Sequence, residues 1–159
     1  MSISLIRFQD LVDILNRLNT EGEFVASVLT DIDGIPLVSA ITGERDLTEP
    51  LAAVVPLVRQ SVQRSNEQAG LAEANEVVVN NSDGARLVSR FFQVEGRMFI
   101  LVCVVPVKRP YRKVMNIAIQ GINRLWQQPS APEREMRSSP APDVVVVSDP
   151  QLVYQNSEG

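Results

Sequence analysis

The chain has 159 residues, of which 45% are hydrophobic and 21% charged, a composition typical of a globular protein with one core. One cysteine and no histidine exclude an intramolecular disulfide, a zinc site of several thiolates and the commonest general base, so we do not expect an enzyme. Residues 1 to 128 carry 13 basic and 14 acidic groups, and 129 to 159 carry 2 and 5. The near-neutral first part argues against nucleic-acid binding.

Membrane insertion and secretion are not expected from the apolar pattern. The longest apolar runs, such as residues 98 to 107, have about half of the roughly 20 residues that a membrane-spanning helix needs. The first ten residues include Arg7 and Asp10 and no long apolar stretch, so no secretory signal is indicated. We therefore expect a cytoplasmic protein without membrane contact.

The last 31 residues differ in composition from the rest. Residues 129 to 159 contain five of the ten prolines, many serine and acidic residues, and Tyr154 as their only aromatic residue. Ordering such a segment costs more entropy than its burial returns. We expect a folded domain over residues 1 to 128 and a disordered, proline-rich acidic tail over 129 to 159. Four valines at 144 to 147 either share this disorder or add as a strand to an exposed sheet edge.

The first part of the chain predicts a helix followed by a hairpin. Ser4 can cap a helix whose apolar residues recur at three- and four-residue spacing until about residue 20. Residues 24 to 30 and 35 to 41 then predict two strands. The sequence DIDG at 31 to 34 predicts the tight turn between them, with its glycine at positive φ.

A second helix follows a polar loop. We expect Thr48 to cap it, Pro50 to lie in its first turn, and the helix to end near Gly70. Pro56 lies inside this span and lacks a backbone N–H. We therefore expect either a kink or a short lead-in helix there.

Three strands and a third helix complete the pattern. Strands are predicted at 76 to 80, 85 to 94 and 97 to 105, and a helix at 111 to 126. The apolar side of that helix is expected to hold Val114, Ile117, Ala118, Ile122 and Leu125. Residues 99 to 105 are all apolar, which indicates a central strand covered on both faces. The sequence therefore predicts an α+β three-layer sandwich: a five-stranded antiparallel sheet with the second helix on one face and the first and third on the other.

The element order and three phrases resemble the roadblock (dynein light-chain) family, of bacterial or archaeal type. The phrases are VLTDIDGIPLVS at 28 to 39, RLVSR at 86 to 90 and FILV at 99 to 102. The resemblance covers about residues 5 to 127 and implies the profilin-like and longin-like fold. It also implies a small interaction module that forms homodimers or heterodimers, has no cofactor, and binds or regulates small Ras-like GTPases of the motility or polarity type.

Two functions are consistent with this resemblance. The first is a regulator or scaffold of a GTPase, and the alternative is a structural adaptor in a cytoskeletal or sensory assembly without GTPase contact. GTPase-activating bacterial members continue with an ordered segment after the last helix, whereas the tail begins here at Pro129. We therefore expect binding rather than full activation. Arg45 and Arg90 are candidates for an arginine donated to a GTPase. A small-ligand sensor would instead need a sizeable pocket with convergent polar groups.

The second predicted helix has two stripes. The stripe expected to cover the sheet holds Leu51, Val54, Val55, Val58 and Val62. The neighbouring stripe holds Ala53, Leu57, Ser61, Ser65 and Ala69, and it either faces water or is smooth enough for another helix to approach. The resemblance implies that dimers pair this helix and continue their sheets through the third strand. It thus places the dimer interface at Leu57, Ser61, Ser65, Ala69, Val77 and Val79.

Four positive charges precede or begin the last helix: Lys108, Arg109, Arg112 and Lys113. They oppose the helix dipole, at a cost of roughly 0.3 to 1 kcal/mol per exposed charge. This cluster is either solvated or a patch for an anionic partner such as an acidic GTPase surface.

The remaining candidate residues do not indicate catalysis, metal binding or cofactor binding. Asp31 and Asp33 lack the further oxygen ligands of a calcium loop, so we interpret them as turn residues. Cys103 lies within an apolar run and is expected to be a buried, unreactive thiol. No phosphate-binding glycine loop is present. We predict no catalytic, cofactor-binding or metal-binding residues.

Overall fold

The computed structural model describes residues 5 to 127, and the tail, its four valines and the Ser4 cap lie outside this range. The elements, in chain order, are α1 (Leu5–Gly22), β1 (Ala26–Asp31), β2 (Pro36–Ile41), α2 (Thr48–Ala69), β3 (Glu76–Asn80), β4 (Arg86–Val94), β5 (Arg97–Val105) and α3 (Arg112–Gln127). The chain divides into two units by its internal contacts, and the larger, Phe8–Leu125, contains the whole sheet. Within the smaller unit, the Arg7 guanidinium lies 5.8 Å from the centre of the Trp126 ring.

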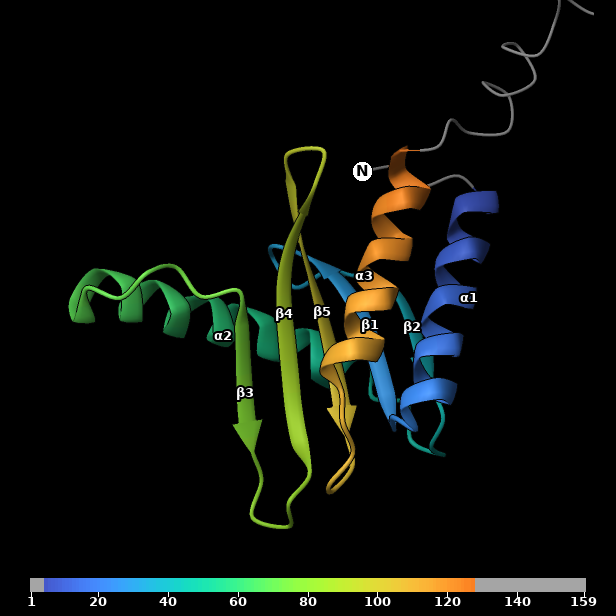
Figure 1. Cartoon of the computed structure of the whole chain (residues 1–159), viewed down its shortest axis with the longest axis horizontal. Coiled ribbons are helices and arrows are strands. Elements are labelled where there is room, and N and C mark those ends of the chain that lie inside the picture. The colour runs from blue at the N-terminus through green and yellow to red at the C-terminus, as the bar shows by residue number, and fades with distance from the viewer. Residues whose placement is uncertain (1–4, 128–159) are drawn as a thin grey trace, which may run out of the picture. The chain divides into compact units, whose positions relative to one another are not determined.

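The sheet has the order β2-β1-β5-β4-β3, with every neighbouring pair antiparallel. Helix α2 covers one face, and α1 and α3 cover the other (Figure 1). The α+β three-layer fold is therefore confirmed. The all-apolar strand β5 lies at the centre as expected, and β2 and β3 form the two edges.

Each face of the sheet has its own core. On the α2 side, a cluster of fully or almost fully buried side chains joins β1, β5 and α2: Ala26, Val28, Leu51, Val55, Ile100 and Val102. On the other side the largest buried side chains include Leu11, Leu15, Leu101, Met115 and Ile122. Because β5 contributes to both sets, its continuous apolar run has a direct physical reason.

The start of α2 differs from the prediction, and of the two alternatives at Pro56 the lead-in helix is not formed. Thr48 is the first helical residue rather than the cap, because its hydroxyl donates a hydrogen bond to the Ser39 hydroxyl at 2.8 Å. The Asp46 carboxylate instead accepts the Thr48 backbone N–H at 3.0 Å, which lowers the pKa of Asp46. The helix also continues through Pro56 as one element, with no separate lead-in helix.

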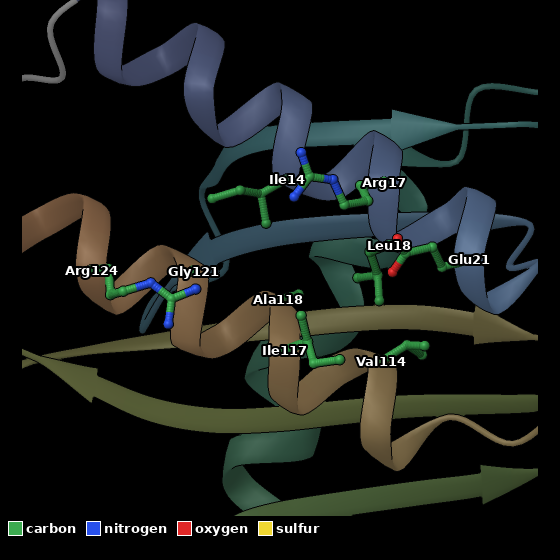
Figure 2. Close-up of a pocket in the computed structure, with 9 residues that line it drawn as sticks. All are labelled: Ile14, Arg17, Leu18, Glu21, Val114, Ile117, Ala118, Gly121 and Arg124. Carbon is green, nitrogen blue, oxygen red and sulfur yellow. The ribbon is translucent and has the colours of Figure 1, made fainter.

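Helices α1 and α3 run antiparallel beside each other and leave a shallow groove between them (Figure 2). The groove is lined by Ile14, Arg17, Leu18, Glu21, Val114, Ile117, Ala118, Gly121 and Arg124. Its volume of about 60 Å³ is far below the roughly 300 to 1,000 Å³ of small-molecule pockets. This groove therefore does not support the function of a small-ligand sensor.

Within residues 5 to 127, none of the helices combines the length and apolar character that crossing a bilayer requires.

Candidate functional site

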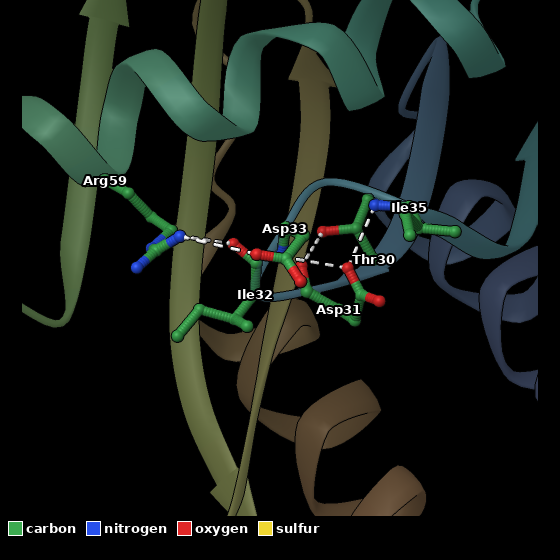
Figure 3. A network of polar contacts seen from close by, with 6 residues as sticks. All are labelled: Thr30, Asp31, Ile32, Asp33, Ile35 and Arg59. Carbon is green, nitrogen blue, oxygen red and sulfur yellow. Dashed lines mark hydrogen bonds and ion pairs between the residues drawn. The ribbon is translucent and has the colours of Figure 1, made fainter. Parts of the chain in front are cut away.

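The β1–β2 turn is built by one carboxylate and tied to α2 (Figure 3). Asp31 Oδ1 accepts the backbone N–H groups of Asp33 at 2.9 Å and Ile35 at 3.0 Å, so Asp31 is a turn residue as predicted. Arg59 Nη1 donates to the Ile32 carbonyl oxygen at 2.9 Å and lies 3.9 Å from Asp33 Oδ1. These contacts fix the turn against the middle of α2. Within residues 5 to 127 no cluster of acidic or cysteine residues could hold a metal ion.

The two halves of α2 differ in how they pack. The first half buries Leu51, Ala52, Val55 and Val58. From Arg59 to the end of the helix no residue is buried, and this half extends past β3 at the sheet edge (Figure 1). Isolated helices shorter than about 12 to 15 residues are marginally stable in water. With only Arg59, Val62 and Ser65 half-buried, the second half of α2 has little of the packing that normally stabilises a helix.

The predicted interface residues of α2 lie mostly on its exposed side. Leu57 is 65% exposed, the highest exposure among the large apolar residues of the described chain. Ser61 and Ala69 are exposed and Ser65 is half-buried. The Ser61 hydroxyl donates to the Leu57 carbonyl oxygen at 3.1 Å, so it is satisfied within the helix. This stripe is therefore made of small residues and one large apolar side chain, Leu57.

Strand β3 presents apolar residues on the same side as α2. Val77 pairs with Ser89 and Val79 with Leu87, and directly paired residues share a face of the sheet. Leu87 packs against the α2-side core cluster, so Val77 and Val79 also face that side. Val79 is 43% exposed. The outer side of β3 has no neighbouring strand in the described chain, which makes β3 an unprotected apolar edge.

Glu76, at the start of β3, anchors this edge. Its carboxylate accepts the Tyr111 hydroxyl at 2.9 Å and lies 3.3 Å from the Arg112 guanidinium and 3.7 Å from Arg90 Nε. Burial and the contact with Glu76 raise the pKa of Tyr111. This cluster was not predicted from the sequence. The signal that would reveal it is the Glu76–Arg90 cross-strand pair, which becomes visible only when the strand register is known.

The basic cluster is partly neutralised. The structure pairs Arg109 with Glu23 and Arg112 with Glu76. In the described part of the chain, only Lys108 and Lys113 of this cluster have no ion pair. A patch for an anionic partner would rest chiefly on these two lysines.

The two arginines considered for donation to a GTPase and the single cysteine differ in solvent exposure. Arg90 contacts Glu76 and its side chain is 19% exposed, so it serves the fold. Arg45 is exposed in the loop between β2 and α2. Cys103 is fully buried in β5, and this burial raises the pKa of its thiol, as expected for an unreactive cysteine.

No protein-family model matches this chain, and no curated protein is similar to it in sequence. Solved structures are similar. MglB of Myxococcus xanthus has a TM-score of 0.66 and 15% identity, covering 80% of this chain and 95% of that one. The gliding protein MglB of Thermus thermophilus has a TM-score of 0.63 and 17% identity, with 80% and 96% covered. A roadblock/LC7 domain of Streptomyces avermitilis has a TM-score of 0.53 and 15% identity, with 79% and 97% covered. The chain has the roadblock fold, as the sequence predicted.

Proposed function

We propose that this chain is a homodimeric interaction module that binds a small Ras-like GTPase as its regulator or scaffold. The observation that carries the proposal is a weakly packed helix half that extends past an unpaired apolar strand edge. Each feature alone is unfavourable for an isolated protomer. A second copy would cover both at once.

The dimer would form around a two-fold axis beside β3. Two β3 strands paired antiparallel would join the two five-stranded sheets into one. The second half of each α2 would then lie over the partner's sheet near Val77 and Val79. Leu57 would lose its exposure to water, and Ser61, Ser65 and Ala69 would allow close helix approach. A heterodimer with a second roadblock protein would use the same surfaces.

The GTPase proposal is supported by the family resemblance and by structural neighbours named MglB, one of them described as a gliding protein. The module would act in the cytoplasm and without a cofactor. It would alter hydrolysis by holding the GTPase switch elements rather than by reacting itself. Lys108 would meet an acidic partner surface, and Arg45 is the exposed candidate for a donated arginine.

Light scattering coupled to size-exclusion chromatography tests the dimer. It is run at high salt, which screens contacts between exposed charges. We expect the wild-type chain to be a dimer and Leu57→Glu to be a monomer with an unchanged circular dichroism spectrum. Ile35→Glu is the matched control, because Ile35 is 57% exposed in the β1–β2 turn. A wild-type monomer, or a Leu57→Glu dimer, would overturn the homodimer.

Calorimetric titration tests the partner. The wild-type dimer is titrated with a motility-type Ras-like GTPase from the same genome, loaded with a GTP analogue or with GDP. Tighter binding of one nucleotide state would support regulation, and equal binding of both would support a scaffold. A dimer that binds neither state would leave the structural adaptor as the function.

A further inference from the structure

The face formed by α1 and α3 lies on the opposite side of the sheet from α2 and has an apolar strip along its groove (Figure 2). Ile117 is 44% exposed, and Ile14 and Val114 are half-buried. The sequence pattern placed both Ile117 and Ile122 on the apolar side of α3. In the structure Ile122 is buried together with Met115, whereas Ile117 remains exposed. The groove thus presents apolar side chains that the fold itself does not cover.

The two helices beside this strip carry opposite charges. Between Phe8 and Gly22, α1 has three acidic residues and one basic residue. Helix α3 has three basic residues and no acidic residue. Arg112 is exposed but paired with Glu76, so among the described residues Lys113 and Arg124 are the exposed α3 charges without an ion pair. Helix α1 is therefore mainly acidic and helix α3 is basic, and the charged residues that line the groove itself are Arg17, Glu21 and Arg124.

The acidic residues of α1 and the basic residues of α3 also lie at similar positions along the length of the groove. A Cβ on Gly121 would lie 3.5 Å from Ile14 Cδ1, so these two residues are at the same level. Because the helices are antiparallel, Arg124 lies near the level of Asp10 and Asp13. Val114 lies near the level of Glu21 (Figure 2), and Lys113 is the residue before Val114 in the same helix.

We propose that this face binds the same face of a second copy of the chain, related by a two-fold axis that runs along the groove. Such a rotation keeps every residue at its level but exchanges the two helices, so α1 of one copy lies over α3 of the other. Glu21 then faces Lys113, and Asp13 faces Arg124. The Ile117 strips meet in the centre of this contact.

A two-fold axis across the groove gives a different result. It would stack α1 on α1 and α3 on α3, and exposed like charges such as Lys113 and Arg124 would then share one rim. Like charges brought together oppose association. The charge pattern therefore selects the axis along the groove. Because this contact and the proposed α2–β3 dimer lie on opposite faces, both can form at once and give assemblies larger than a dimer.

Sedimentation velocity of the full chain at low salt tests the contact. We expect species larger than a dimer that dissociate at high salt. Glu21→Lys and Lys113→Glu should each weaken this association roughly tenfold, because every contact contains the pair twice. The double variant should restore it. Glu44→Lys, an equal charge change in the loop before α2, is the matched control.

The same charge changes in the Leu57→Glu background separate the two proposals. There we expect a monomer–dimer equilibrium at low salt that Lys113→Glu shifts to monomer. Wild-type chain that never exceeds a dimer, or a double variant no stronger than its single variants, would overturn the groove contact. Both results would leave the α2–β3 dimer standing.

Discussion

Gly34 closes the β1–β2 turn with a φ of 84° and lies directly against α2. A Cβ at this position would come within 2.8 Å of the Ala52 carbonyl oxygen, so both the backbone conformation and the space require glycine. We expect Gly34→Ala to lower the free energy of unfolding by about 2 to 3 kcal/mol. Gly96 is the control, because its φ is 80° but a Cβ there would meet nothing within 4 Å. Gly96→Ala should cost about 1 kcal/mol. Equal losses in urea unfolding would show that the contact with α2 is irrelevant.

Tyr111 should make the free energy of unfolding fall as the pH rises above about 10. Its hydroxyl donates to Glu76, and burial together with this contact raises the pKa of Tyr111. As pH rises, the unfolded chain loses this proton first, near pH 10. The stabilisation is thus complete below that value and is lost as pH passes the pKa of the folded state. We expect Tyr111→Phe to be about 1 kcal/mol less stable than wild type at pH 8, with the difference shrinking towards pH 11. Urea unfolding over this pH range measures it, and a constant difference would contradict the assignment.

At the scale of elements, periodicity and turn residues predicted much of the fold. The bounds of β3 and β5 are those expected, because a glycine turn follows β3 and another precedes β5. The contacts of Glu76 with Tyr111 and Arg112 could not be predicted, since these residues are 35 and 36 positions away in the sequence. Only the tertiary arrangement brings them together. Of the predicted interface residues, Leu57 and Val79 are exposed apolar side chains, but a stripe pattern alone cannot distinguish a solvated surface from an interface.

Gly121 lies in the middle of α3, where glycine is a poor helix former. A Cβ there would make an ordinary contact with Ile14 at 3.5 Å. We expect Gly121→Ala to raise the free energy of unfolding by up to about 1 kcal/mol. Gly70 ends α2 with a φ of 67°, so Gly70→Ala should have the opposite sign. Thermal unfolding of both variants checks the prediction, and a destabilised Gly121→Ala would mean that α1 and α3 cannot adjust to one methyl group.

At the scale of the whole molecule, the α2 side and the α1/α3 side of the sheet differ in how completely their elements are packed. The α2 side leaves a helix half weakly packed and a strand edge unpaired, which affects folding itself. The α1/α3 side has a complete core and leaves only a narrow apolar strip between charged rims. Association on the α2 side should therefore stabilise the folded chain strongly, whereas the groove contact should be weaker and sensitive to salt.

This difference predicts how thermal stability depends on protein concentration. If folding is coupled to the α2–β3 dimer, each tenfold rise in chain concentration adds about 1.4 kcal/mol to the stability of a dimer. The wild-type Tm at high salt should then rise with concentration. The Leu57→Glu variant should melt at a lower temperature that does not change with concentration, because its monomer has no partner to lose. Scanning calorimetry over a hundredfold range measures both. A wild-type Tm independent of concentration would mean that the second half of α2 is stable without a partner, and the argument for the dimer from its missing packing would fail.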